Sequence, residues 1–157
     1  MTAAPDLVVL LAGACERMLT EVLESLEAAG HPRLGASQAF MLRLAGGEGS
    51  TISRMAEITR MTPQAVSKVV DQLVALGLAE RTPDARDGRV KQVRQTSGGR
   101  EVAQLVEDTL ARLEEGWRAE VGERRLATLR ACLESFVAAG QAPAPARTAR
   151  AMRIRLT

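Results

Sequence analysis

The sequence predicts a mainly α-helical chain that carries one small β-hairpin, and three observations support this fold class. Apolar residues recur at helical spacing along most of the chain. Only 2% of the residues are aromatic and none is Tyr, so Leu, Val, Ala, Ile and Met have to build the core, a composition that favours helices. One stretch near the middle instead alternates on both sides of an Asp-Gly pair, which is typical of a hairpin.

The first two helices are predicted from apolar stripes. Residues 6–29 carry Leu7, Leu10 and further apolar side chains at spacings of three and four, with glutamates on the other face and Gly30 as a stop. A second, shorter helix is predicted over residues 36–45. The side chains expected to face inward there are Phe40, Met41 and Leu44.

Two short helices joined by a tight turn are predicted next. The first is "TISRMAEIT", residues 51–59. The second begins after Thr62, a favourable N-cap, with Pro63 at its first position, and it stops at Gly77. Its inner face is expected to consist of Val66, Val69, Val70, Leu73 and Leu76.

The hairpin follows these helices directly. A strand-like "LAERT" precedes a turn at Asp87 and Gly88, and the alternating segment "VKQVRQ" comes after it. The helical period returns at Ser97 and is weakened at two glycines, 116 and 122. A last helix is predicted over residues 123–139, before a Pro/Ala linker and a basic tail.

Positive charge is concentrated in one part of the chain. Residues 50–101 hold nine Lys or Arg against six Asp or Glu, and the last eleven residues hold four arginines and no acid. The rest of the chain is net acidic. Because the formal net charge is only +2, this distribution, and not the total, indicates a polyanionic partner.

Several classes of protein are disfavoured by the residues present. Cys15 and Cys132 lie too far apart in sequence to give a metal-ligand spacing, and the chain has one His. No Ser-His-Asp set or phosphate-binding loop is visible, so we expect neither an enzyme nor a cofactor. No apolar run has membrane-spanning length and no signal sequence is visible, so we expect a cytoplasmic protein without a membrane partner.

The middle of the chain resembles the multiple-antibiotic-resistance regulator (MarR) family. The similarity runs from about residue 35 to residue 102 and includes "TISRMAEITRMTPQAVSKVVDQLVALGLAER" and the hairpin after it. Its most specific motifs are D-x-R at Asp87 and Arg89 and T-x-x-G at Thr96 and Gly99. The residue before that Thr is usually aliphatic in the family and is a glutamine here.

The resemblance implies a winged helix-turn-helix at residues 35–101. It places dimerisation helices at residues 1–34 and 102–140, with a linker and basic tail at 141–157. It also implies an obligate homodimer that binds double-stranded DNA at a pseudo-palindromic operator. The expected function is therefore that of a transcriptional repressor, relieved by a small molecule or by cysteine oxidation.

The second helix of the motif carries short or polar side chains near its N-terminal half, the part of such a helix that enters the major groove. Gln64 can pair with adenine through two hydrogen bonds, Ser67 can bond a phosphate or a base edge, and Lys68 can neutralise a phosphate. Arg54 and Thr62 are further candidates for phosphate contact. The alternative is an ordinary solvated helix face and, for Thr62, a structural cap.

The hairpin turn is predicted to project Arg86 and Arg89 toward a narrow minor groove, where the negative potential is enhanced. By similarity to the family, Asp87 orients the arginine through a charge-assisted hydrogen bond. Lys91, on the following strand, completes the DNA-binding candidates. The alternative is a surface pair between Asp87 and Arg89, but such a pair contributes only about 0–1 kcal/mol and leaves the surplus of cations unexplained.

The resemblance also places an effector cavity between the dimerisation helices and the winged helix. Because the chain has no Tyr and little charge near that junction, we expect a small, mainly apolar or aromatic compound. Arg17 or Arg43 is available to pair with an acid group on it.

Two other functions stay open. The peroxide-sensing branch of the family carries its reactive cysteine on the first helix, where Cys15 lies, but supports it with tyrosines that this chain lacks. A Cys on a mostly apolar helix is also common as buried filler. A winged helix can also bind protein instead of DNA.

The basic tail at the end of the chain has three possible roles: it can be disordered, contact DNA, or dock on the partner subunit. Its alternating Met152, Ile154 and Leu156 favour docking.

Overall fold

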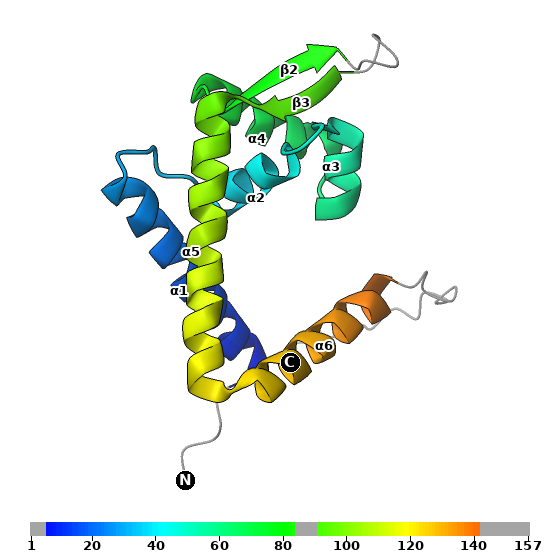
Figure 1. The fold of residues 1–157 in the computed structure, drawn as a ribbon. Helices are drawn as coiled ribbons and strands as arrows, with labels where there is room; N and C mark the ends of the chain where they lie inside the picture. Colours follow the sequence, from blue (N-terminus) through cyan, green and yellow to red (C-terminus); the bar gives the residue numbers. More distant parts are fainter. Residues whose placement is uncertain (1–5, 84–90, 142–157) are drawn as a thin grey trace, which may run out of the picture. The chain divides into compact units, whose positions relative to one another are not determined.

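The computed structural model describes residues 6–83 and 91–141 and confirms the predicted fold class (Figure 1). The elements, in chain order, are α1 (Leu7–Ala28), α2 (Ala36–Leu44), β1 (Ser50–Thr51), α3 (Ile52–Thr59), α4 (Pro63–Ala75), β2 (Ala79–Pro83), β3 (Lys91–Gln95), α5 (Ser97–Val121) and α6 (Glu123–Gln141). The chain divides into two compact units, Met1–Glu114 and Glu115–Thr157, which are described separately.

Local capping signals set the starts of the helices. The Asp6 carboxylate accepts a hydrogen bond from the Val8 backbone N–H at 2.9 Å, and α1 begins there. The Thr62 hydroxyl accepts from the Ala65 N–H at 3.2 Å, and Pro63 occupies the first position of α4, as predicted. These contacts satisfy backbone donors that a helix start leaves without partners.

The sheet has three strands in the order β1-β3-β2, all antiparallel. β2 and β3 pair over five residues, with Arg81 opposite Val93, and they are the two strands of the predicted hairpin. The prediction of a two-stranded hairpin was incomplete, because Ser50 and Thr51 add a third strand at the other edge of β3. A strand of two residues shows no periodicity, so its position depends on the tertiary fold.

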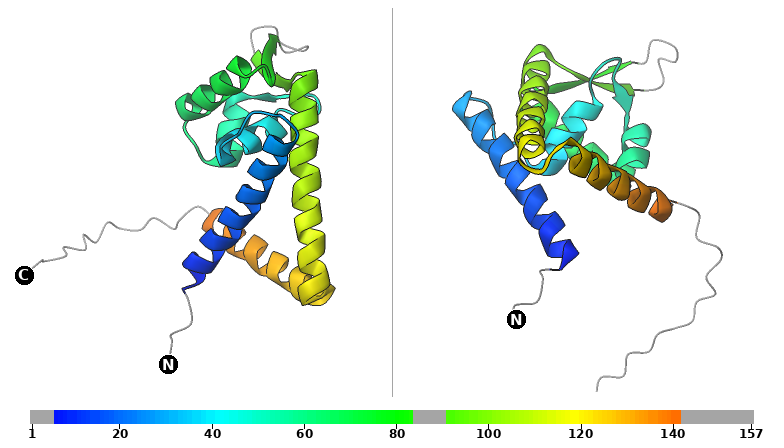
Figure 2. Two further views of the ribbon diagram at one scale, coloured as in Figure 1. Left: turned by 90° about the vertical axis from the view of Figure 1, so that its left-hand side faces the viewer. Right: turned by 60° about the horizontal axis from the view of Figure 1, so that its bottom comes forward.

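The core of the first unit lies among α2, α4, the sheet and the facing sides of α1 and α5. Its most completely buried side chains are Leu26, Met41, Leu42, Met55, Val66, Val70, Leu73, Val93 and Val102. α4 contacts α2, α3 and β2, and Figures 1 and 2 show these elements grouped together. In the same unit, the Arg112 guanidinium donates to the Ser25 hydroxyl at 3.4 Å and joins α5 to α1.

Two residues predicted to face inward are exposed instead. Phe40 is 44% exposed, and α2 buries Ala39, Met41 and Leu42. Leu76, just past the end of α4, is 41% exposed. A nine-residue helix rich in apolar residues presents more than one possible stripe, so the neighbouring elements decide which stripe is buried.

The T-x-x-G motif joins three elements. The Thr96 hydroxyl donates to the Gly77 carbonyl at 2.7 Å and accepts from the Gly99 N–H at 3.0 Å. The Thr96 N–H donates to the Leu78 carbonyl at 3.1 Å. A Cβ on Gly99 would lie 1.8 Å from the Leu78 carbonyl oxygen, so the backbones of α5 and of the α4–β2 connection meet where no side chain fits.

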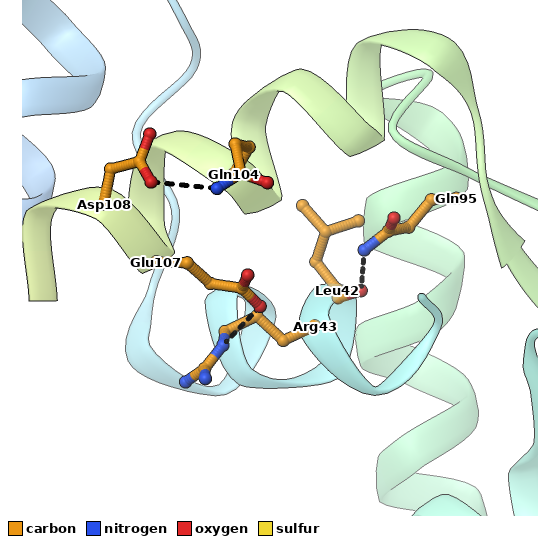
Figure 3. A network of polar contacts seen from close by, with 6 residues as sticks. All are labelled: Leu42, Arg43, Gln95, Gln104, Glu107 and Asp108. Atoms are coloured by element: carbon orange, nitrogen blue, oxygen red, sulfur yellow. Dashed lines mark hydrogen bonds and ion pairs between the residues drawn. The ribbon is translucent and has the colours of Figure 1, made fainter. Parts of the chain in front are cut away.

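Gln95, the departure from the family pattern, connects β3 to α2 (Figure 3). Its side-chain amide donates to the Leu42 carbonyl at 2.8 Å, and its backbone N–H donates to the Ala45 carbonyl at 3.1 Å. The Leu42 carbonyl also accepts from the Ala45 N–H at 3.2 Å, so the Gln95 amide adds a second donor there, and the Gln95 backbone supplies a donor to Ala45 at the end of α2. The amide therefore packs the second wing strand through polar contacts where an aliphatic residue would use apolar ones.

The long helical region at the C-terminal side breaks at one of the two glycines that were predicted to weaken it. Gly116 lies inside α5, whereas Gly122 has a φ of 87° and separates α5 from α6. α6 leaves Phe136 79% exposed and Val137 56% exposed. Among the described helices, none is long and apolar enough to span a membrane.

Candidate nucleic-acid interface

The exposed face of α4 carries the three polar residues predicted to read DNA. Gln64 and Lys68 are exposed and Ser67 is half-buried. They lie at spacings of three and four, which places them on one side of the helix. On the opposite side Val66, Val70 and Leu73 are buried and anchor the helix, so an apolar core holds this polar face in place.

Arg81 on β2 contacts this face. Its Nη2 donates to Ser67 Oγ at 3.1 Å and to Asp71 Oδ1 at 2.8 Å. The sequence analysis did not predict this contact, because Arg81 and Asp71 lie on different elements, ten residues apart along the chain. The missing information was the distance between the strand and the helix, which is a tertiary property.

The two predicted phosphate contacts on other elements already have partners. Arg54 on α3 forms an ion pair with Glu57 at 2.7 Å, so a phosphate has to compete with that carboxylate. The Thr62 oxygen accepts the capping hydrogen bond from Ala65, which leaves its hydroxyl proton for another acceptor. A cap and a phosphate contact are therefore compatible at Thr62.

The wing is described on both sides of its tip. Lys91 begins β3 opposite Pro83 and is exposed. The remaining predicted wing residues, Arg86, Asp87 and Arg89, lie outside the described residues. The ends of β2 and β3 therefore mark the base of the wing, and β2 packs beside α4.

Arg43, predicted as a partner for an acidic effector, is paired within the chain (Figure 3). Its Nε lies 3.3 Å from Glu107 Oε1 on α5, and the pair joins α2 to α5. Nearby, the Gln104 side chain donates to Asp108 at 2.8 Å along the same helix. An acid group at Arg43 therefore has to bind its Nη donors beside the Glu107 carboxylate or displace that carboxylate.

The thiol groups of both cysteines are exposed. Cys15 on α1 and Cys132 on α6 are free, so the interpretation of Cys15 as buried filler is wrong for this chain. Cys15 lies seven residues before Val22 and eleven before Leu26, so it is on the same side of α1 but about two turns nearer the N-terminus than the buried part of the helix. Within residues 6–83 and 91–141, no group of three or more His, Cys, Asp or Glu is placed to hold a metal ion.

Comparison with known proteins identifies what this arrangement is similar to. A sequence model of the MarR family matches residues 35–90, which contain α2, α3, α4 and β2. No curated protein matches the chain significantly.

Solved structures with a similar fold cover most of the chain. CouR from Rhodococcus jostii RHA1, bound to p-coumaroyl-CoA, is 24% identical with a TM-score of 0.69, over 86% of this chain and 95% of CouR. MepR from S. aureus, in complex with DNA, is 19% identical with a TM-score of 0.70, over 87% of this chain and 99% of MepR. The reduced form of MarR from E. coli is 20% identical with a TM-score of 0.63, over 86% and 98%.

Proposed function

Because residues 35–90 match the MarR-family model and the chain has the winged-helix fold, we propose that it is a sequence-specific transcriptional repressor that acts as a homodimer on a pseudo-palindromic operator. The match to this family and the similarity to a solved structure described as a MarR-family transcriptional regulator support a regulator and not an enzyme. The observation that carries the proposal is the exposed face of Gln64, Ser67 and Lys68 on α4, inside the matched segment and next to the wing strands. This face fits a helix that enters the major groove, with β2 and β3 leading the wing toward the flanking backbone.

Exposed apolar residues support the homodimer. Leu7, Val8, Val9 and Leu10 are 67%, 70%, 62% and 53% exposed at the start of α1. Four consecutive apolar residues on a helix surface favour burial against a partner. α6 carries further exposed apolar side chains, so both helices assigned to dimerisation offer surface that a second copy can cover.

Several features support a small effector of apolar or aromatic character. The chain offers mainly aliphatic side chains for a cavity wall and no Tyr. The similar protein CouR is bound to p-coumaroyl-CoA, a thioester of an aromatic acid. An effector of this class relieves repression if it binds better to the conformation that cannot engage DNA.

The proposal is tested by selecting bound sequences from random DNA and titrating the selected operator at increasing salt. Neutralisation of six or more phosphates predicts a loss of affinity of roughly 10³-fold between 50 and 200 mM salt. A winged helix that binds protein instead of DNA would select no sequence and show no such salt dependence. Small aromatic acids and phenols are then screened for release of the DNA.

A thiol-based sensor of the same fold is the second candidate, because Cys15 and Cys132 are both exposed. Peroxide treatment then releases the operator from the wild-type protein, and Cys15→Ser abolishes the release. If peroxide leaves DNA binding unchanged in the wild type, the redox candidate is wrong and the small-molecule effector remains.

A further inference from the structure

Arg81 holds two successive turns of α4 with one nitrogen atom. Its Nη2 donates to Ser67 Oγ at 3.1 Å and to Asp71 Oδ1 at 2.8 Å. Ser67 and Asp71 are four residues apart and therefore lie above one another on the same side of the helix. The first wing strand, whose first residue Ala79 lies in the same core as the buried side of α4, is thereby also attached to the predicted DNA-reading face.

Neither stability nor charge accounts for this arrangement. The Arg81 and Asp71 side chains are 33% and 65% exposed, and an ion pair at such a surface contributes only about 0–1 kcal/mol. The carboxylate also neutralises the guanidinium, so the pair adds no net positive charge to the face. What the contact does determine is the orientation of the Ser67 hydroxyl.

A serine hydroxyl has one proton to donate and two lone pairs to accept with. Arginine has no acceptor, so its contact with Ser67 occupies a lone pair of Oγ and turns that side of the oxygen toward β2. In the described part of the chain, no atom accepts the Ser67 proton, whereas the hydroxyls of Thr59 and Thr128 each donate to a carbonyl four residues earlier at 2.8 Å. Within the described residues, the Ser67 proton is therefore left without an acceptor.

We propose that Arg81 is a positioning residue for DNA recognition, which holds Ser67 as a hydrogen-bond donor to an acceptor on DNA. This inference rests on the proposed function and names the chemistry that Ser67 recognises. The acceptors that DNA presents in the major groove are purine N7, guanine O6 and thymine O4, and the backbone adds phosphate oxygens. A base edge is favoured, because Ser67 shares its helix face with Gln64 in the first half of α4.

The test is a double-mutant cycle of Arg81→Ala and Ser67→Ala, measured by fluorescence anisotropy on the selected operator. The set also includes operators in which each base pair is changed singly. Each single variant is expected to bind the best operator about tenfold more weakly, the effect of one lost hydrogen bond in a desolvated interface. Both are expected to lose discrimination at the same base pair of each half-site. The double variant is expected to bind no more weakly than Ser67→Ala alone.

The pattern across operators identifies the acceptor. Loss of preference at one base pair supports a base edge, and equal, still non-additive loss on every operator supports a phosphate. Additive effects of the two substitutions overturn the inference, because Arg81 would then contact DNA by itself or act through general stability. An Arg81→Ala variant with unchanged affinity and preference overturns it as well.

Two controls separate positioning from other effects. Arg33 is also an exposed arginine in an ion pair, with Glu27 at 3.4 Å, but it lies before α2, so Arg33→Ala should leave affinity unchanged. Thermal unfolding of all variants detects a loss of folded protein. Such a loss would make Arg81→Ala weaken binding equally in the wild-type and Ser67→Ala backgrounds. If the wild type selects no DNA, both the proposed function and this inference are wrong. If the wild type binds DNA but the affinity losses of the two substitutions are additive, only the role of Arg81 is wrong.

Discussion

Gln64 and Lys68 lie on the same exposed face of α4, but their side chains offer DNA different chemistry. An amide both donates and accepts, so it can distinguish base edges, whereas an ammonium group acts mainly as a point charge. Their roles at the interface should therefore differ in kind.

Gln64→Ala should change which operators are preferred and cost about 1–3 kcal/mol on the best site. Lys68→Ala should weaken binding to all sequences similarly and lower the salt slope by about one. Anisotropy titrations against the selected operator and scrambled DNA distinguish the two effects. Equal losses by both variants on every sequence would show that Gln64 does not read bases.

Two adjacent glycines at the start of α5, Gly98 and Gly99, differ in whether a side chain fits at their position. A Cβ on Gly99 would collide with the Leu78 backbone, whereas the nearest atom to a Cβ on Gly98 is 4.0 Å away. Gly99→Ala should lower the free energy of unfolding by about 3 kcal/mol or more, because backbone has to move. Gly98→Ala should change it by less than about 1 kcal/mol, and chemical denaturation of both variants provides the comparison. If Gly99→Ala lowers the free energy of unfolding only slightly, the backbones of α5 and of the α4–β2 connection can move apart at little cost.

At the scale of elements, α5 ends at Val121 because the backbone of the next residue, Gly122, leaves the helical conformation. Gly122 adopts a φ of 87°, in the left-handed region, and Gly116 lies in regular helix with no atom within 4 Å of an added Cβ. The same substitution should therefore have opposite effects at the two positions.

Gly116→Ala should raise the free energy of unfolding by roughly 0.5–1 kcal/mol, because alanine has the higher helix propensity. Gly122→Ala should lower it by about 1–2 kcal/mol, the cost of a left-handed conformation for a residue with a Cβ. Thermal melts at one fixed protein concentration measure both. Stabilisation by Gly122→Ala would indicate that α5 and α6 can join into one continuous helix.

At the scale of the whole molecule, the exposed apolar residues at the start of α1 are the surface that the proposed homodimer would bury. We expect a stable two-fold dimer at micromolar concentration, measured by sedimentation equilibrium. Leu10→Glu, at a residue that is 53% exposed in the single chain, should shift the protein toward monomer, because a charge would be buried in the interface. A monomeric wild type at that concentration would contradict the proposed assembly.

The tail at residues 142–157 lies outside the described residues, and its role is open to a direct test. Removing residues 141–157 should lower dimer stability and leave the salt slope of DNA binding unchanged, if the tail docks on the partner subunit. A shallower slope with weaker DNA binding would assign it to the DNA backbone instead. Full retention of both properties would leave it without either role.

The sequence by itself determined most of the elements and the character of the predicted reading face. Thr62 and Pro63 marked the start of α4, Gly77 its stop, and the three-and-four spacing of Val66, Val70 and Leu73 its buried side. These signals are local, because caps, glycines and periodicity act within a few residues of chain. The family motifs added the identity of the winged helix.

Only the tertiary structure decided which surfaces meet. It exposed Phe40, recruited Ser50 and Thr51 as a third strand, and paired Arg43 with Glu107. It also brought Arg81 onto Ser67 and Asp71, a contact on which the proposed positioning role of Arg81 rests. Each of these contacts joins residues from different elements, so it depends on how the elements pack and not on the spacing along any one of them.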